Sequence, residues 1–374
     1  MKKTGVAYLP LHDGKCPPWL FKKMVRLSKA ICEIILQDFG KRELLRRLSN
    51  PFFFQSLGCA VGFDYHSSGL TTTLTGALKE SLNLEEHGVV VCGGKGRASK
   101  LTLNEIEEFG SKLSLSSQKI ERLKYCSRIV AKVDTSAIQA GYTLYHHAFF
   151  ISEDGCWAVV QQGLNPGNRF ARRYHWLSEK VQTFVLEPHS GLFGEKIEDA
   201  VLNLTSSKSV DAQKTIVDIL REKPVKVKNL VGELNDKLHV TLMDWILPEP
   251  KKSAIKNLVM PVNVDWDAVK RLYEIQPKDF EEVLMAYGVG PSTIRALALI
   301  SNLIYGAEVD WEDPIKYSFC VGGKDGVPYP IDKKAYEESI RFIKEAVEGS
   351  EVGLEDKKYA LKRLNTILAK TFYK

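Results

Sequence analysis

Residues 143–162, TLYHHAFFISEDGCWAVVQQ, hold the pattern that decides the fold of the first half of the chain. Aromatic and β-branched residues, which favour strands, occupy both sides of the polar turn formed by Glu153, Asp154 and Gly155. This pattern predicts two antiparallel strands, at 143–151 and 156–162, that are joined by a hairpin. Apolar runs at 88–92 and 181–186 predict two further strands.

Helical patterns surround these strands. Apolar residues at helical spacing predict helices at 19–48, with a break at Gly40, and at 71–82, and a capping box at 102–105 opens another helix. From about Val210 the strand pattern fades, and helices are expected at 210–221, 228–236, 266–274, 280–306, 333–348 and 354–371. The polar run TSSKS at 205–209 is typical of a linker. We therefore expect an α+β protein, with a mixed α/β domain at residues 1–204 and a mainly helical domain at residues 205–374.

The composition is that of a globular protein with a basic excess. The chain has 374 residues, of which 44% are hydrophobic, and its net charge is +6. Between Lys22 and Arg47, eight basic residues accompany three acidic ones, which gives this stretch a net charge of +5. Such a stretch is suited to the phosphates of DNA, and a solvated helix surface has the same composition.

The cysteines indicate a protein of the cell interior. All seven are scattered without a Cys-x-x-Cys pair, so neither a zinc ribbon nor an iron–sulfur site is expected. Several lie in apolar runs, which is typical of buried, reduced thiols. No stretch approaches the roughly 18 consecutive apolar residues that a membrane span needs. We expect a cytoplasmic protein, and the sequence does not indicate its oligomeric state.

A second informative stretch is FEEVLMAYGVGPSTIRALALISNLIYG, at residues 280–306. It predicts two helices joined by a tight turn, in which glycine allows positive φ and Pro291 suits the first position of the second helix. The free amides and the dipole at the start of that helix favour an anion. The stretch therefore predicts a site for a DNA phosphate; a plain helical corner capped by glycines is the alternative. The residues expected to bind DNA here are Gly288, Val289, Gly290, Ser292, Thr293 and Arg295.

This stretch resembles the helix-hairpin-helix motif of DNA repair proteins, and its continuation is similar to the base-excision DNA glycosylases. In that superfamily an aspartate after the hairpin stabilises the cationic sugar as the base leaves. The resemblance places this role on Asp310, which follows Val309 and stands 20 residues after Gly290. Ser292 stands where strand-nicking members have a lysine, which implies weak lyase activity. The chain departs from the motif at Tyr287, where proline is usual, and no His-x-x-Arg follows Asp310. The N-cap of a short helix is the other interpretation of Asp310.

The whole chain also resembles an uncharacterised family of archaeal and thermophile proteins. The segments that carry this resemblance are GFDYHSSG at 62–69, GGKG at 93–96, VQQG at 160–163, ARRYHW at 171–176, EPHSG at 187–191 and GGKDG at 322–326. The resemblance spans nearly the whole chain. It implies a cytoplasmic protein associated with DNA.

Two carboxylate–histidine pairs suggest a metal site in the first half. Asp64 with His66, and Glu187 with His189, stand at alternate positions, so each pair lies on one side of an extended segment. Oxygen and imidazole ligands could bind a divalent metal that activates water against a phosphodiester. Histidines in strands are more usually hydrogen-bonded within the core.

Two other stretches could contact DNA. The glycine-rich turn after the strand at 88–92 lacks the phosphate-loop pattern of ATPases, but its amides, with Lys95 and Arg97, could hold a phosphate. The stretch RFARRYHW at 169–176 interleaves cations with rings that can stack on bases. The residues expected to bind DNA there are Arg169, Arg172, Arg173, Tyr174 and Trp176, with Gln161 and Gln162 from the preceding strand. In the alternative, the rings lie in the core and the arginines pair with acids.

These observations favour a DNA-binding DNA repair enzyme that excises bases and uses Asp310. A metal-dependent DNA nuclease with its active site in the N-terminal domain is the second interpretation. A non-catalytic DNA-binding protein is the third.

Overall fold

The computed structural model describes residues 16–63, 69–194, 196–238, 259–315 and 333–372. Its centre is an antiparallel sheet of five strands in the order β1-β3-β4-β5-β6. The strands are β1 (Val89–Lys95), β3 (Thr143–Ser152), β4 (Trp157–Leu164), β5 (Ala171–Leu177) and β6 (Gly191–Gly194). The predicted hairpin is confirmed, since β3 pairs with β4 from Ile151 opposite Trp157. The α+β class is confirmed as well.

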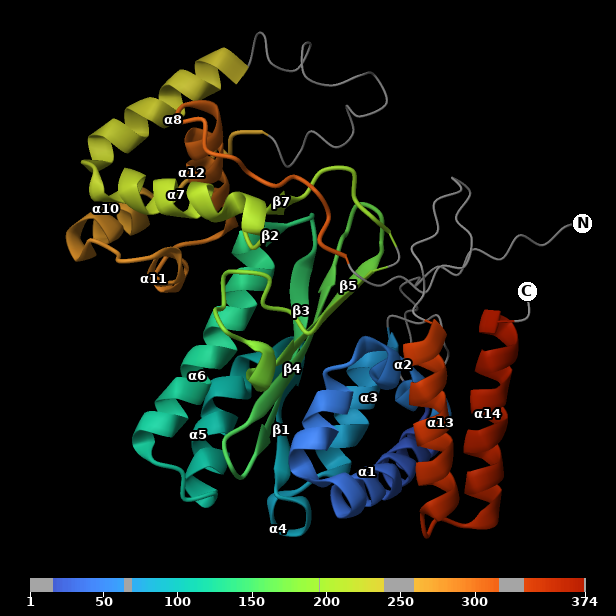
Figure 1. Ribbon diagram of the computed structural model, residues 1–374. Helices are drawn as coiled ribbons and strands as arrows, with labels where there is room; N and C mark the ends of the chain where they lie inside the picture. The colour runs from blue at the N-terminus through green and yellow to red at the C-terminus, as the bar shows by residue number, and fades with distance from the viewer. Residues whose placement is uncertain (1–15, 64–68, 195, 239–258, 316–332, 373–374) are drawn as a thin grey trace, which may run out of the picture.

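Helices cover both faces of this sheet (Figure 1). One face packs against α5 (Thr102–Lys112) and α6 (Ser117–Lys132), and the other against α1 (Pro18–Leu48), α2 (Pro51–Ala60) and α3 (Gly69–Ser81). The helix α1 leaves helical geometry at Gly40, as predicted. Side chains alternate between the faces along β5: Tyr174 and Trp176 lie in the core beside α6, and Leu177 lies in the core beside α2.

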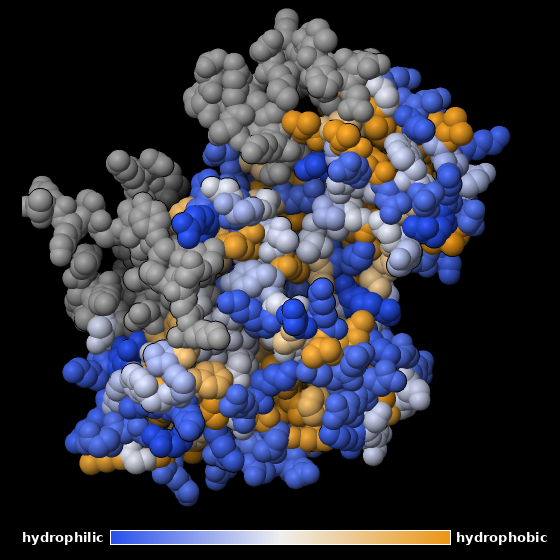
Figure 2. Space-filling model, turned by 180° about the vertical axis from the view of Figure 1, so that it is seen from behind, coloured by the Kyte–Doolittle hydropathy of each residue, from blue (hydrophilic) through white to orange (hydrophobic). Residues whose placement is uncertain are grey.

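The helices α7 (Val210–Arg221), α8 (Pro224–Leu238), α10 (Trp266–Ile275), α11 (Phe280–Met285) and α12 (Pro291–Leu303) gather at one end of the sheet (Figure 1). Their apolar side chains continue the core on the α6 face, so one core crosses the predicted boundary at residue 204. Exposed hydrophobic residues of this part include Val225, Val262 and Tyr305. Hydrophobic surface gathers at the same end when the molecule is seen from behind (Figure 2).

The last two helices depart from the predicted domain division. The helices α13 (Lys333–Gly349) and α14 (Leu354–Phe372) pack beside α1 and α2, far from α7–α12 (Figure 1). Ile340 and Leu364 share a core with Met24 and Phe53. Residues 205–374 therefore do not form one domain. An amphipathic pattern predicts that a helix buries one face, but not which partner covers it.

Two short predictions are also corrected. No strand forms at 181–186, because these residues make bends and turns. The Phe184 side chain within them packs against Trp157 and Trp176. The expected linker at 205–209 is instead packed against the fold: Thr205, Ser206 and Ser209 are buried, and the 3-10 turn η4 (Ser207–Ser209) follows β7 (Leu202–Asn203). The remaining short elements are α4 (Leu84–His87), η1 (Gly96–Leu101), η2 (Val133–Ala137), β2 (Ile138–Gln139), which pairs with β7, and η3 (Ser178–Lys180). No helix in the described part of the chain has the length and apolar character of a membrane span.

Candidate active site

Residues selected from the sequence for different reasons meet at one cavity of about 250 Å³. Asp310 lines it together with Glu187 and His189, although Asp310 lies more than 120 positions after both of them in the chain. Glu312 and Asp313 also line it, so the walls carry four carboxyl groups. Asp64 and His66, the other predicted metal pair, lie outside the described residues.

The Asp310 side chain is held by its surroundings. Its backbone bridges to β7, where the Asn203 amide donates to the Asp310 carbonyl oxygen at 2.9 Å. Its carboxylate accepts hydrogen bonds from the Glu312 amide at 3.0 Å and from Asn203 Nδ2 at 3.5 Å. No helix begins at residues 310–315, so the interpretation of Asp310 as a helix N-cap is wrong. The Asp310 carboxylate is instead held at the cavity by its hydrogen bonds to Asn203 and to the Glu312 amide.

Glu187 and His189 reach the cavity from a strained loop. The backbone of Glu187 is left-handed, with φ of 41°, and its amide donates to the Thr205 carbonyl oxygen at 2.8 Å. Such a conformation is unfavourable for a residue with a side chain, and strain of this kind is common at functional sites. The side chain of Glu187 is exposed, whereas that of His189 is nearly buried.

His189 is bound to a carboxylate that the sequence did not single out. Its Nε2 lies 2.6 Å from Oδ1 of Asp134, which is fully buried in the π-helical turn η2 at the end of α6. Oδ2 of Asp134 accepts hydrogen bonds from Trp176 Nε1 at 2.9 Å and from Gln161 Nε2 at 2.5 Å. Burial raises the pKa of Asp134 above its ordinary value, and the three hydrogen bonds, which favour the charged carboxylate, offset part of this rise.

The hydrogen bonds continue beyond Asp134 into the core. Because the Gln161 amide nitrogen donates to Asp134, its oxygen accepts from His147 Nδ1 at 2.8 Å. The other ring nitrogen of His147 then accepts from the Ser127 hydroxyl at 2.9 Å. Burial lowers the pKa of His147 to about 4, which keeps this ring neutral near pH 7. A buried chain of hydrogen bonds therefore leads from α6 to His189.

Asp134 could have been recognised from one signal. It continues the buried face of α6, on which Leu123, Ser127 and Val130 precede it at spacings of three and four residues. An acid on the core face of a helix needs partners, since burying an unpaired charge is strongly unfavourable.

Most of the expected DNA contacts in the sheet are corrected by the structure. Arg172, Arg173, Tyr174 and Trp176 are buried, as are Gln161 and Gln162, so none of these side chains presents a surface to DNA. Trp176 and Gln161 instead hold Asp134. Arg172 pairs with Asp313 at 2.5 Å, both side chains being fully buried. Within that stretch, Arg169 is exposed.

The glycine-rich turn predicted at 93–97 is instead the end of β1 and the start of η1, and its first amide is bound by a carboxylate. Glu105, expected in a capping box, instead accepts a hydrogen bond from the Gly93 amide at 2.6 Å and pairs with Lys79 at 2.7 Å. The predicted phosphate cradle is therefore occupied by an anion of the protein itself. Lys95 and Arg97 remain exposed beside it.

The two glycines between α11 and α12 have different roles. Gly288 has φ of +85°, and a Cβ there would lie 2.5 Å from Arg271 Nη2. Arg271 in turn donates to the Tyr287 carbonyl oxygen at 3.1 Å, which holds the turn closed. Gly290 is extended, and a Cβ there would meet nothing within 4 Å. Gly288 is thus required by the turn, whereas Gly290 borders open space.

The other residues of this turn also fall into two groups, those used within the fold and those that could meet a ligand. The side chain of Val289 is buried and its amide donates to the Ala286 carbonyl oxygen at 3.2 Å, so that amide is already used. Thr293 accepts a hydrogen bond from the Asp265 amide at 3.2 Å through its hydroxyl. The amides of Ser292 and Thr293 lie in the first turn of α12, where no helical acceptor reaches them. Arg295 is partly buried, which lowers its pKa, and its Nε has no partner in the described part of the chain.

One segment connects this turn with the cavity. Lys132 Nζ donates to the Val289 carbonyl oxygen, and Gln139 Nε2 donates to the Pro291 carbonyl oxygen at 2.9 Å. Asp134, which binds His189, lies between Lys132 and Gln139 in the sequence. The strand β2 that contains Gln139 pairs with β7, whose Asn203 bridges to Asp310. The turn and the cavity are therefore held at a fixed distance from each other.

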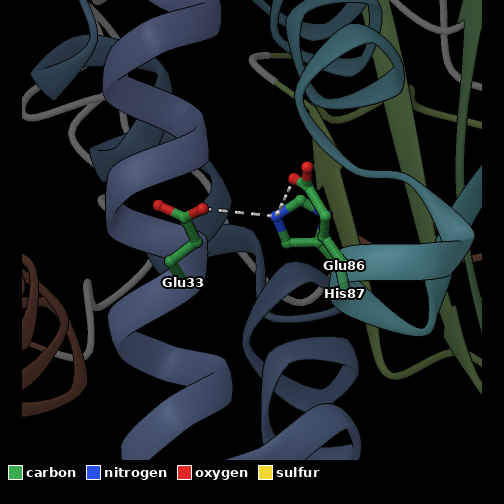
Figure 3. A group of neighbouring side chains, drawn as sticks. All are labelled: Glu33, Glu86 and His87. Atoms are coloured by element: carbon green, nitrogen blue, oxygen red, sulfur yellow. Dashed lines mark ion pairs between the residues drawn. The ribbon is translucent and has the colours of Figure 1, made fainter.

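Another cluster of acidic and histidine side chains has the residue types of a metal site. Among the described residues, one group of three possible ligands has its ligand atoms within 4.8 Å of one another: Glu33, Glu86 and His87 (Figure 3). Lys29 pairs with Glu86 at 2.6 Å and with Glu33 at 3.8 Å, so a cation of the protein already serves both acids. Nδ1 of His87 accepts from the Asn83 amide at 3.1 Å, which leaves the proton of a neutral ring on Nε2. This arrangement fits an ion-pair network better than a metal centre.

Comparison with known proteins identifies one family. No curated protein and no solved structure matches this chain. The family model described as "Protein of unknown function (DUF763)" matches residues 5–331, and the chain therefore belongs to this family.

Proposed function

We propose that the protein is a DNA repair enzyme that hydrolyses the bond between a base and its sugar in the cavity at Asp310. One observation carries this proposal: Asp310 lines a cavity together with Glu187 and His189, and the same framework holds the glycine turn of α11 and α12. The turn would bind the DNA backbone, and the cavity would act on the sugar and base.

The charges favour the glycosidic bond as the target. Four carboxyl groups line the cavity, and one of them, Asp313, is neutralised by Arg172. Negative walls repel a phosphate but stabilise the positive charge that develops on the sugar when its base departs. Asp310 is suited to this role because its carboxylate is already held by Asn203 and Glu312.

The turn supplies the complementary positive surface. The first amides of α12 are open to an anion, and Lys132, Arg271 and Arg295 lie on or next to the turn. Contacts to phosphates bind any DNA sequence and fix the position of the protein on the strand.

The central experiment compares Asp310→Asn with Glu312→Gln on a panel of damaged, single-stranded and branched DNA oligonucleotides. Glu312 lines the same cavity but its side chain is 80% exposed, which makes it a matched control. We expect Asp310→Asn to bind DNA normally and to release base on the order of 10²–10³-fold more slowly, because the amide keeps the shape and removes the charge. Wild-type turnover by Asp310→Asn would move the active site elsewhere.

The role of the turn is tested at Gly290, where the structure offers a substitution that leaves the fold intact. Gly290→Leu should weaken binding to all DNA sequences, because its side chain fills the space in which a phosphate would approach the backbone. Gly232→Leu in α8, also in open space, is the control. Equal affinities of the two variants, measured by titration at fixed salt, would exclude this turn as a DNA contact.

A second candidate function is metal-dependent cleavage of DNA. It is favoured by the ligand types of Glu187, His189 and Asp310, which line one cavity. The ligand atoms of these three described residues do not all lie within 4.8 Å of one another, so a cation would have to draw them together. The same oligonucleotide panel separates the two functions, since exhaustive chelation should abolish metal-dependent cleavage and leave base release intact.

A further inference from the structure

We propose that Asp134 positions His189 so that its Nδ1 takes a proton from the water that attacks the sugar in this cavity. This inference rests on the proposed function and adds a water-activating residue to it. Neither residue belongs to the stretch that resembles the glycosylases, since both lie in the first half of the chain.

The first step of the argument is the hydrogen bond itself. Oδ2 of Asp134 already accepts from Trp176 and Gln161, an environment that favours the charged carboxylate, and we assign the charged form to it. Oδ1 then accepts, and His189 Nε2, at 2.6 Å, donates. A neutral ring that carries its proton on Nε2 has a free electron pair on Nδ1. This is the tautomer that a base needs.

The second step is rigidity. The carboxylate of Asp134 is fixed on its other side by Trp176 and Gln161, and it is fully buried. The Trp176 ring also lies against the His189 ring, with centroids 4.4 Å apart. The imidazole is therefore held in place before any substrate binds, and such preorganisation is what a general base requires.

The third step is location. His189 and Asp310 line the same cavity. Because Asp134 takes Nε2 of His189, we assign the attacking water to Nδ1. In the reaction, the bond between the sugar C1′ and the base nitrogen breaks, and its electron pair leaves with the base, which takes a proton from solvent. The water oxygen forms the new bond to C1′, and its proton moves to His189 Nδ1. Asp310 stabilises the cationic sugar between these events.

The positioning role can be measured without any substrate. Long-range ¹H–¹⁵N correlation spectra of the folded protein should show His189 with a proton on Nε2 and none on Nδ1. Asp134→Asn should lose this preference, because an amide does not enforce a donor at Nε2. Trp176→Phe is the matched control: it removes one donor to Asp134 but leaves the His189 contact, so the tautomer should persist. A proton on Nδ1 in the wild-type protein would overturn the inference.

Turnover supplies the second test. His189→Gln and Asp134→Asn should each lower kcat for base release on the order of 10²–10⁴-fold, with KM changed only a few-fold. Base release by His189→Gln at the wild-type rate would overturn the inference while leaving the proposed function standing. Failure of the proposed function looks different, because the wild-type protein itself would then release no base, whatever the tautomer of His189.

Discussion

Arg172 and Arg173 are neighbours in sequence, both are buried, and their surroundings differ completely. Arg172 points to the α6 face of the sheet and pairs with Asp313, an acid of the candidate cavity. Arg173 points to the opposite face, where its partners are Gln55, Thr71 and His175. Burial lowers the pKa of Arg173, whereas Asp313 holds the pKa of Arg172 above its ordinary value against the same effect.

The difference distinguishes the two faces as a whole. On the α6 face, buried polar groups end in carboxylates, Asp134 and Asp313, and the hydrogen bonds lead to the surface at His189. On the α2 face, the described polar groups around Arg173 and His175 are neutral and enclosed by helices. Buried charge that is paired and connected to a cavity distinguishes the face that carries the candidate site.

The largest effect on stability should come from the paired arginine. Arg172→Met leaves the Asp313 carboxylate buried without its positively charged partner, which should destabilise the fold by about 3–5 kcal/mol. Arg173→Met leaves no buried charge unpaired but removes hydrogen bonds to neutral groups, so its cost should be smaller, about 1–3 kcal/mol. Urea unfolding of both variants measures the contrast. Equal losses would show that the two faces do not differ in this way.

An intermediate effect is expected on acidification. Burial lowers the pKa of His146 to about 3 and that of His147 to about 4, from 6.5 in the unfolded chain. Below pH 6.5 the unfolded chain takes up protons that the fold excludes, so this stability is present above pH 6.5 and is lost as the pH falls. At pH 5 the loss should reach about 2 kcal/mol for each histidine.

The two histidines lie on opposite faces, which makes them a matched pair. His146 bonds to Thr75 of α3, and His147 bonds to Ser127 of α6. His146→Gln and His147→Gln should each reduce the difference between unfolding free energies at pH 7.5 and pH 5. An unchanged difference in the double variant would assign the acid sensitivity to other groups.

The smallest effect is expected at the far end of the hydrogen-bond chain. Ser127→Ala removes the donor to His147 and should cost about 1 kcal/mol, while base release and the His189 tautomer stay unchanged. A loss of turnover comparable to that of Asp134→Asn would mean that the whole chain, rather than Asp134 alone, orients His189.

Local patterns were sufficient to predict much of the fold and three residues of the candidate site, Asp310, Glu187 and His189, but not that these three line one cavity. The β3–β4 hairpin and the break at Gly40 follow from residues close in sequence, so their patterns predicted them. The stretch around Arg172 misled because cations between rings are typical of a DNA surface and equally of a strand buried on both faces. Asp134 was missed because its partners, Gln161, Trp176 and His189, are 27 to 55 residues away.

The packing of the last helices on the first ones has a consequence for synthesis. Arg363 donates to the Cys59 carbonyl oxygen across 304 residues of chain, and Phe342 packs against Phe53 with ring centroids 6.2 Å apart. At roughly 5–20 residues per second, a ribosome needs about 15–60 s to add that length. During this interval the parts of α1 and α2 that α13 and α14 will cover have no partner from these two helices. The nascent protein must therefore avoid aggregation through this surface until α13 and α14 emerge.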